Sequence, residues 1–188
     1  SLGHHIIDLV PGLIGLKGKQ SFFADIAGIR ADAKVDLYIE NAYVCSERGE
    51  LQLTNYGISG IPVFQLSRVA TRALSEQKKV YATLNFVPFW EKEQCLTYFK
   101  ERFKEADEKR IGEALIGFFP EKLIPVLLEE SHIKASKYAN RLQAEEIERF
   151  VDTAQGLRVD ITDWNTFDTA QVTAGGVDTD EIDAETME

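Results

Sequence analysis

The chain has 188 residues, 44% of them hydrophobic, and its 31 acidic against 21 basic side chains give a formal net charge of −10. A protein that binds nucleic acid through its phosphates needs a basic face, so this balance argues against that class of partner. No apolar run approaches the roughly 20 residues of a membrane span and no secretory signal pattern is present, so we expect a cytoplasmic protein with no membrane partner.

The first third of the chain has the pattern of antiparallel β-structure. Short apolar runs with alternation, such as Val35, Leu37 and Ile39, are typical of half-buried strands. A four-residue connection over 46–49 contains glycine and predicts a hairpin. Strands are expected over residues 5–9, 21–29, 33–39, 43–45 and 51–54.

A glycine-rich turn over residues 56–60 follows these strands. Its two glycines, three apart, permit positive φ or a close backbone approach. Pro62 suits a first helical turn, and the apolar residues after it predict a helix over 62–75. The turn would then lie at a helix N-terminus, where free amides favour anions or carbonyl oxygens. Ser59 lacks the spacing of a nucleophile elbow, so we interpret it as a turn or capping residue.

The middle of the chain changes to a helical period after a strand over residues 80–87. Cys95, Phe99 and Phe103 begin an apolar stripe, and a proline at 120 separates the two helices that follow. We expect a small bundle packed on its own phenylalanines. Helices are predicted from residue 91 to about 106, over 111–119, over 123–128 and over 144–153.

Two strands are predicted after the bundle, over residues 157–161 and 167–173, joined by 162–165, and we expect both to rejoin the β-structure. The second runs into Gly175 and Gly176, and such a double glycine lets the backbone lie flat against a neighbour. A large planar ligand would suit that surface, although an ordinary turn explains either glycine stretch taken alone. The acidic segment 178–183 lacks the spacing and glycine of an EF-hand, so we expect a solvated loop.

Histidines and cysteines do not form a metal-binding pattern. His4 and His5 are adjacent, so on a strand they point to opposite faces, and His132 stands alone. Cys45 and Cys95 are far apart, and a disulfide framework or a metal site needs more cysteines or closer spacing. We expect two reduced cysteines and no metal.

Several motifs together resemble the aminoacetone-oxidase-like, BaiN-type FAD-dependent flavoproteins of bacteria. The resemblance runs nearly the whole chain. It is carried by Ser1-Leu2-Gly3-His4, Gly28-Ile29-Arg30, Gly49-Glu50-Leu51, Thr54 with Tyr56-Gly57-Ile58-Ser59-Gly60, Ala170-Gln171-Val172-Thr173-Ala174-Gly175-Gly176-Val177 and Thr186-Met187-Glu188. Two positions depart from the pattern, since many relatives have His where this chain has Asn55 and Pro where it has Ile61. Asn55 puts any transfer of a catalytic role for that His in doubt.

The resemblance implies an α+β fold: an antiparallel β-barrel-like subdomain over residues 1–90 and 156–188 with a small α-helical bundle inserted over 91–155. It also implies a discontinuous FAD-binding domain that flanks this segment and is absent from this chain. The residues agree, because Gly12, Gly15 and Gly18 do not have the spacing of a dinucleotide-binding fingerprint. We expect FAD in the full-length protein and none in this chain alone.

The resulting hypothesis is an excised insert or substrate-cap domain of an FAD-dependent oxidoreductase, inactive by itself, whose partner in cis is its own FAD-binding domain. Thr54, Tyr56, Gly57, Ser59 and Gly60 would line the cavity of an unknown small-molecule substrate or the domain junction, with Tyr56 as a polar contact. Thr173, Ala174, Gly175 and Gly176 would face the cofactor, and no catalytic residue is assigned. The alternative is a free-standing small-ligand or protein-interaction module without catalytic activity.

Overall fold

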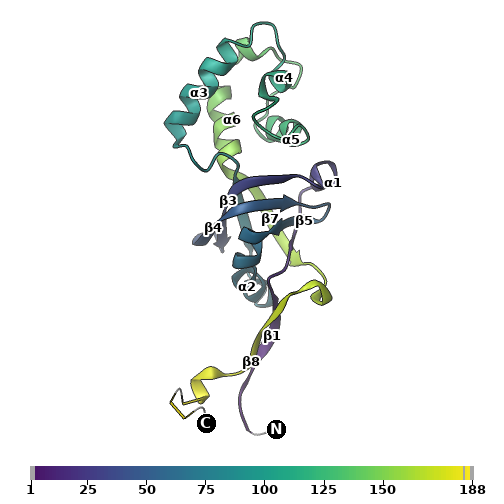
Figure 1. The fold of residues 1–188 in the computed structure, drawn as a ribbon, viewed down its shortest axis with the longest axis vertical. Coiled ribbons are helices and arrows are strands. Elements are labelled where there is room, and N and C mark those ends of the chain that lie inside the picture. Colours follow the sequence, from purple (N-terminus) through teal and green to yellow (C-terminus); the bar gives the residue numbers. More distant parts are fainter. Residues whose placement is uncertain (1–2, 184, 187–188) are drawn as a thin grey trace.

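A computed structural model describes residues 3–183 and 185–186, so the motif residues Ser1, Leu2, Met187 and Glu188 lie outside the described part. The chain forms three tiers along one long axis (Figure 1): a two-stranded ribbon beside both termini, a β-barrel, and a group of helices. The ribbon consists of β1 (Ile6–Gly12) and β8 (Val172–Val177). The barrel lies between the other two tiers, so it positions both.

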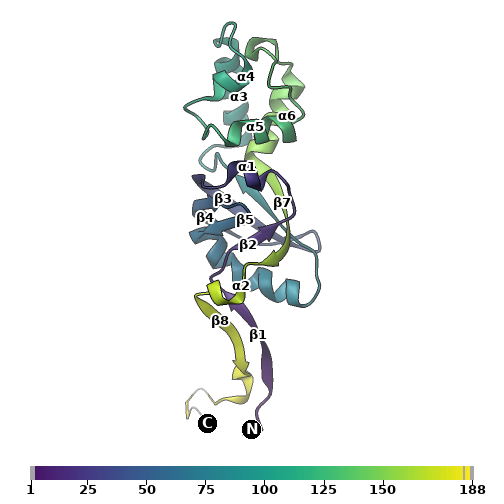
Figure 2. The same cartoon turned by 90° about the vertical axis from the view of Figure 1, so that its right-hand side faces the viewer.

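Six antiparallel strands close the barrel in the order β2-β5-β4-β3-β6-β7. The predicted α+β class with an antiparallel barrel is therefore confirmed. Helix α1 (Phe23–Ile26) lies at the end of the barrel that faces the helical tier, and α2 (Ile61–Ser75) lies across the end that faces the ribbon (Figure 2). The strands are β2 (Leu16–Gly18), β3 (Arg30–Ile39), β4 (Ala42–Leu53), β5 (Gly57–Gly60), β6 (Val80–Asn85) and β7 (Leu157–Trp164).

The hairpin predicted over residues 46–49 is wrong, because β4 runs without a break through this polar segment and pairs with β3 along its length. Cross-strand ion pairs, Arg48 with Asp32 at 3.0 Å and Arg30 with Glu50 at 2.8 Å, allow polar residues to form the outer face of a strand. The turn instead occupies Glu40 and Asn41, whose φ angles of 49° and 67° are typical of tight hairpin turns.

Two further strand predictions are wrong. Residues 21–29 contain the short helix α1, because Phe23 and Ile26 both point into the core from one turn of helix. Residues 167–173 do not return to the barrel. They form the 3-10 helix η2 (Phe167–Thr169) and the start of β8, which pairs with β1 outside the barrel.

The helical tier is inserted between two strands that pair with each other, since Leu84 of β6 lies opposite Leu157 of β7. Phe99, Phe103, Phe119 and Phe150 pack ring against ring at its centre. The phenylalanine stripe is therefore core, as its spacing indicates. The tier consists of α3 (Lys92–Lys104), α4 (Ile111–Leu115), α5 (Leu123–Glu130), the 3-10 helix η1 (Ala139–Arg141) and α6 (Ala144–Gly156).

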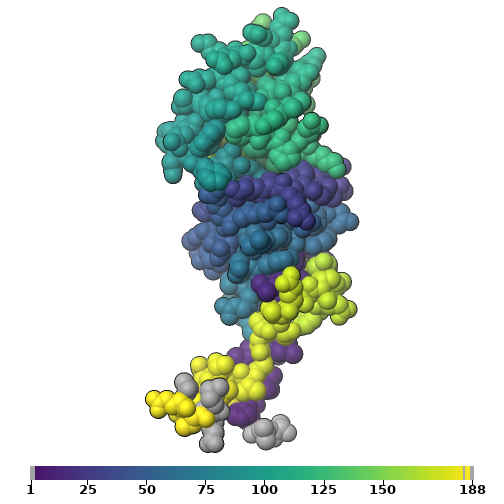
Figure 3. Space-filling view, viewed as in Figure 1, coloured from purple at the N-terminus to yellow at the C-terminus, as the bar shows by residue number. Residues whose placement is uncertain are grey.

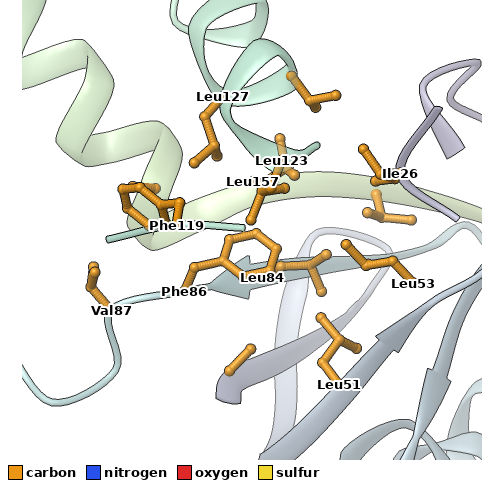
Figure 4. Packing of buried hydrophobic residues seen from close by; sticks show 14 of the residues in the cluster. Ile26, Leu51, Leu53, Leu84, Phe86, Val87, Phe119, Leu123, Leu127 and Leu157 are labelled. Atoms are coloured by element: carbon orange, nitrogen blue, oxygen red, sulfur yellow. The ribbon is translucent and has the colours of Figure 1, made fainter. Parts of the chain in front are cut away.

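One continuous hydrophobic cluster joins the barrel interior to the helical tier. In Figure 4, Leu51 and Leu53 from the barrel lie on one side of Leu84 and Leu157, and Leu123 and Leu127 of α5 lie on the other. Because the helices cover the end of the barrel in this way, the two tiers form a single packed unit. No helix in the described part of the chain is long and apolar enough to cross a membrane.

The helical tier includes a partly buried ion pair between Lys137 and Glu146. The Lys137 ammonium contacts both carboxylate oxygens of Glu146 at 2.6 and 2.7 Å, and the amide of Gln143 donates to the same carboxylate at 2.8 Å. Burial alone would raise the pKa of Glu146, but the Gln143 amide and the Lys137 ammonium together hold this pKa below its usual value.

We expect Glu146→Gln to lower the free energy of unfolding at pH 7 by about 1 kcal/mol. A carboxyl with a depressed folded pKa stabilises fully above its unfolded pKa of about 4.3, and this stabilisation is lost as the pH falls through the folded value. Urea unfolding from pH 7 to pH 3 should show the difference from the parent chain shrinking below about pH 4.5. Glu145→Gln, at an exposed neighbour, is the control. A difference that does not depend on pH would contradict this account.

Candidate functional site

The ribbon is held at both ends by backbone pairing between residues far apart in sequence. Ile6 lies opposite Val177 and Gly12 opposite Val172, with a register shift between Ile7 and Val10. Beyond Val177, the amide of Asp178 donates to the carbonyl of His5 at 3.0 Å. The described chain therefore enters and leaves this end of the molecule as two adjacent strands.

The double glycine of β8 lies within this ribbon. Gly175 has a φ of 111°, and a Cβ there would lie 2.5 Å from the carbonyl oxygen of Asp8 in β1. The close approach of β1 therefore requires glycine at position 175 of β8. Gly176 has the same φ, but its missing Cβ would meet nothing within 4 Å. The positive φ of Gly176 favours glycine, and the position where a Cβ would lie is open space within the described chain.

The ribbon also exposes apolar side chains. Ile6 and Leu9 of β1 are 57% and 59% exposed, and Val172 and Val177 of β8 are exposed as well. A lone two-stranded ribbon has too little surface to bury such residues on itself. Contiguous apolar surface on a protein is typical of contact sites. Figure 3 shows that the molecule is narrowest here, with the ribbon standing clear of the barrel.

Two buried hydroxyls of α2 attach the ribbon to the barrel. Thr71 donates to the carbonyl of Pro11 at 2.8 Å, and the amide of Ile14 donates to the Ser67 hydroxyl at 3.3 Å. Both α2 side chains are completely buried. Since Pro11 belongs to β1 and Ile14 precedes β2, these bonds hold the point where the chain passes from ribbon to barrel.

A groove of about 610 Å³ lies between the second half of α2 and the ribbon. Val69 and Ala73 of α2 and Ile7 and Ala174 of the ribbon give it an apolar wall. The remaining lining residues are Ile39, Arg68, Arg72, Glu76, Lys78, Gly175, Val177 and Thr179.

The charged residues of the groove are not balanced. Lys78 and Glu76 form an ion pair at 2.6 Å, and the hydrogen bond from Lys78 lowers the pKa of Glu76. Arg68 and Arg72 form no salt bridge with any described residue. Arg72 also contributes to the lowered pKa of Glu76 through its charge. The groove therefore combines an apolar wall with three cationic side chains and one carboxylate.

The predicted glycine turn is a paired strand and not an open loop. Residues 57–60 form β5, between β2 and β4. A Cβ at Gly57 would lie 2.2 Å from the Leu16 carbonyl oxygen, and one at Gly60 would lie 2.5 Å from that of Glu50. These glycines are thus explained by close backbone approach within the barrel. Gly60 also precedes α2 with a φ of 97°.

The other predicted residues of this stretch serve the same corner of the barrel. Thr54 holds the turn, because its hydroxyl bonds to both the amide and the carbonyl of Gly57 at 3.1 Å. The Tyr56 hydroxyl lies beside Gly15, where a Cβ would be only 2.6 Å away, and Ser59 is buried in β5. Asn55 is exposed. None of the five predicted residues lines the groove.

The structure separates the two predicted groups of site residues but brings part of the second to the groove. Ala174 and Gly175 line it, and Thr173 lies opposite Pro11 in the ribbon. Sequence reasoning missed Arg68 and Arg72. The available signal was their spacing of four residues on the polar face of the predicted helix, but their importance depends on the ribbon that lies across from them.

The histidines at the start of the ribbon contact acidic residues. The Nδ1 atom of His4 lies 3.2 Å from Glu181, and the Nδ1 atom of His5 lies 3.6 Å from Asp178. No cluster of three or more potential metal ligands occurs among the described residues. Cys45 and Cys95 are both free, and burial raises the pKa of each thiol.

Comparison with known proteins matches the chain to a family model and to a curated relative. A family model described as "HI0933-like protein barrel and H2TH domain" matches residues 10–172. The 3-dehydro-bile acid delta(4,6)-reductase of Clostridium scindens is 40% identical over 188 residues, which are 100% of this chain and 46% of that protein. The chain therefore spans about half the length of this curated relative.

We expect Gly57→Ala to lower the free energy of unfolding by more than about 2 kcal/mol, because the new methyl group would push β2 away from β5 and open the barrel. Gly156→Ala is the matched control, since a Cβ there meets nothing within 4 Å. Urea unfolding of both variants measures the difference. Equal stability of the two would contradict the assigned strand pairing.

We expect Thr71→Val to lower the free energy of unfolding by about 1–3 kcal/mol, because the isosteric side chain leaves the Pro11 carbonyl without its buried donor. Hydrogen exchange should become faster for the paired amides of β1 and β8 and remain unchanged in α3 and α6. Thr97→Val removes a comparable hydroxyl that bonds within an exposed helix turn, and it is the control. Unchanged ribbon exchange would show that the attachment lies elsewhere.

Proposed function

Because the chain belongs to the HI0933-like family of barrel and H2TH domains, and is an insert domain of its BaiN-type FAD-dependent flavoproteins, we propose that it is the substrate-cap domain of a cytoplasmic bacterial oxidoreductase. In this proposal the flavin is held by a domain outside these residues. The barrel and ribbon would form one wall of the substrate cavity. The Clostridium scindens relative is named as a reductase of 3-dehydro-bile acids, and we propose redox chemistry on a small molecule for the parent protein.

The bare backbone at Gly176 is the observation that carries this proposal. The position has no side chain, a φ of 111° and no atom of the described chain within 4 Å of the point where a Cβ would lie. A flat ring system can approach such a backbone more closely than it can approach any residue with a side chain. Exposed apolar residues on both strands of the ribbon support the same reading, since they would be covered by a neighbouring domain.

The residues of this chain could form one wall of an FAD site, but they do not make up a complete FAD-binding site. A flavin supplies electron-pair transfer when it is bound. Thr173, Ala174, Gly175 and Gly176 would face it along β8, while the required pyrophosphate-binding glycine pattern is missing from the sequence. This chain would contribute shape, exclusion of water and orientation of the substrate.

The glycine stretch around β5 would have a supporting role. Thr54, Gly57, Ser59 and Gly60 hold a corner of the barrel, and Tyr56 packs beside Gly15, close to the ribbon. We propose that this corner supports the domain junction. In the same proposal, Tyr56 makes a polar contact to the substrate.

The proposal predicts that Gly176→Ala in the full-length flavoprotein weakens FAD binding by tenfold or more, because the methyl group would occupy space needed by the ring. Flavin content by absorbance and FAD affinity by titration of the apoprotein measure this effect. Gly28→Ala and Gly117→Ala are matched controls, because these glycines also have positive φ, 90° and 81°, and open space around them. Their backbone strain should therefore be similar.

If all three variants bind FAD like the parent protein, the flavin does not contact Gly176 and the proposal is wrong. If all three lose FAD equally, strain and not contact explains the loss, and the proposal is again contradicted. Selective loss in Gly176→Ala supports it.

A further inference from the structure

The groove between α2 and the ribbon contains a pair of arginines placed for one ligand group. Arg68 and Arg72 are four residues apart on α2, so they lie on the same face of the helix, and both line the groove. Neither forms a salt bridge with a described residue; Glu76 pairs with Lys78 and is also influenced by the charge of Arg72. The lining thus carries three cationic side chains against the single carboxylate of Glu76, and two guanidinium groups on one wall favour a ligand with a planar anionic group.

The rest of the groove favours an apolar body attached to that group. Val69 and Ala73 from α2, with Ile7 and Ala174 from the ribbon, provide its wall. The volume of about 610 Å³ lies within the range of roughly 300–1,000 Å³ that is typical of small-molecule sites. An inorganic anion alone would leave most of this apolar surface uncovered.

We propose that the groove binds the substrate as an organic acid: Arg68 and Arg72 bind its carboxylate, and the apolar wall receives its hydrocarbon body. This inference rests on the proposed function, because Gly175 lines the groove and Gly176 is the next residue along β8. A ligand held at the arginines would therefore lie beside the wall assigned to the flavin. Charge complementarity identifies the occupant, since an acidic ligand offsets positive charge of the groove and a neutral one does not.

The test uses cholate, which has one carboxylate on a rigid apolar body, and its uncharged methyl ester. Equilibrium dialysis of each radiolabelled compound, below the concentration at which cholate forms micelles, against the full-length flavoprotein gives the two affinities. Arg68→Gln, Arg72→Gln and the double variant are compared with Arg141→Gln, an exposed arginine of the helical tier that lies outside the groove. Flavin absorbance and melting temperature are recorded for every sample.

We expect each groove variant to weaken cholate binding about tenfold, as for one charge-assisted hydrogen-bonded contact. The double variant should bind cholate and its methyl ester equally, and Arg141→Gln should match the parent protein. Flavin absorbance and melting temperature should not change. Equal binding of both compounds by the parent protein, or cholate binding that is unaffected in the double variant, would overturn the inference.

Two further outcomes separate this inference from the proposed function. Loss of flavin or of melting temperature in the arginine variants, with cholate binding unchanged, would overturn the inference and identify the groove as a contact with the flavin domain. Cholate binding that depends on the arginines, in a protein whose flavin is insensitive to Gly176→Ala, would support the groove and reject the cap assignment.

Discussion

The rest of the structure depends on closure of the barrel by strand β2, which is only three residues long. Leu16 of β2 lies opposite Ile58 of β5 on one side and Trp164 of β7 on the other. Without β2, both neighbours would be open edges with unpaired backbone groups. Only three residues separate the end of β1 from the start of β2. Closure of the barrel therefore also determines where the ribbon is joined to the barrel. Site geometry thus follows from the barrel and not from the ribbon itself.

The tiers are nested, each inserted between two strands that pair with each other. The helical tier interrupts the pair formed by β6 and β7, and the barrel with its helices interrupts the pair formed by β1 and β8. An insertion of this kind leaves the surrounding pairing intact, because its two ends meet at the spacing of adjacent strands, about 5 Å. The proposed insertion of the whole chain into a flavin domain repeats this arrangement once more, with His5 and Asp178 side by side.

Local patterns predicted those elements whose burial depends on their own periodicity. The stripe of Cys95, Phe99 and Phe103 predicted α3, and Pro62 with the apolar residues after it predicted α2. The errors occurred where distant partners decide. The polar stretch 46–49 continues as a strand because Arg48 forms an ion pair with Asp32 on the neighbouring strand. Gly57 allows the backbone of Leu16 to approach closely, and no local sequence pattern shows this contact. The groove could not be predicted, because its walls are about 100 residues apart in sequence and meet only when the ribbon is attached through Thr71.

The two-stranded form of the ribbon has a mechanical consequence. A single linker would let the barrel rotate in any direction relative to whatever the ribbon is attached to. Two strands joined by hydrogen bonds resist sliding and bending within their own plane, and they bend easily only across it. The Thr71 and Ser67 hydroxyls make the barrel end of this strip rigid. Bending across the plane of the ribbon would therefore be the easiest movement of the barrel relative to anything joined to the ribbon.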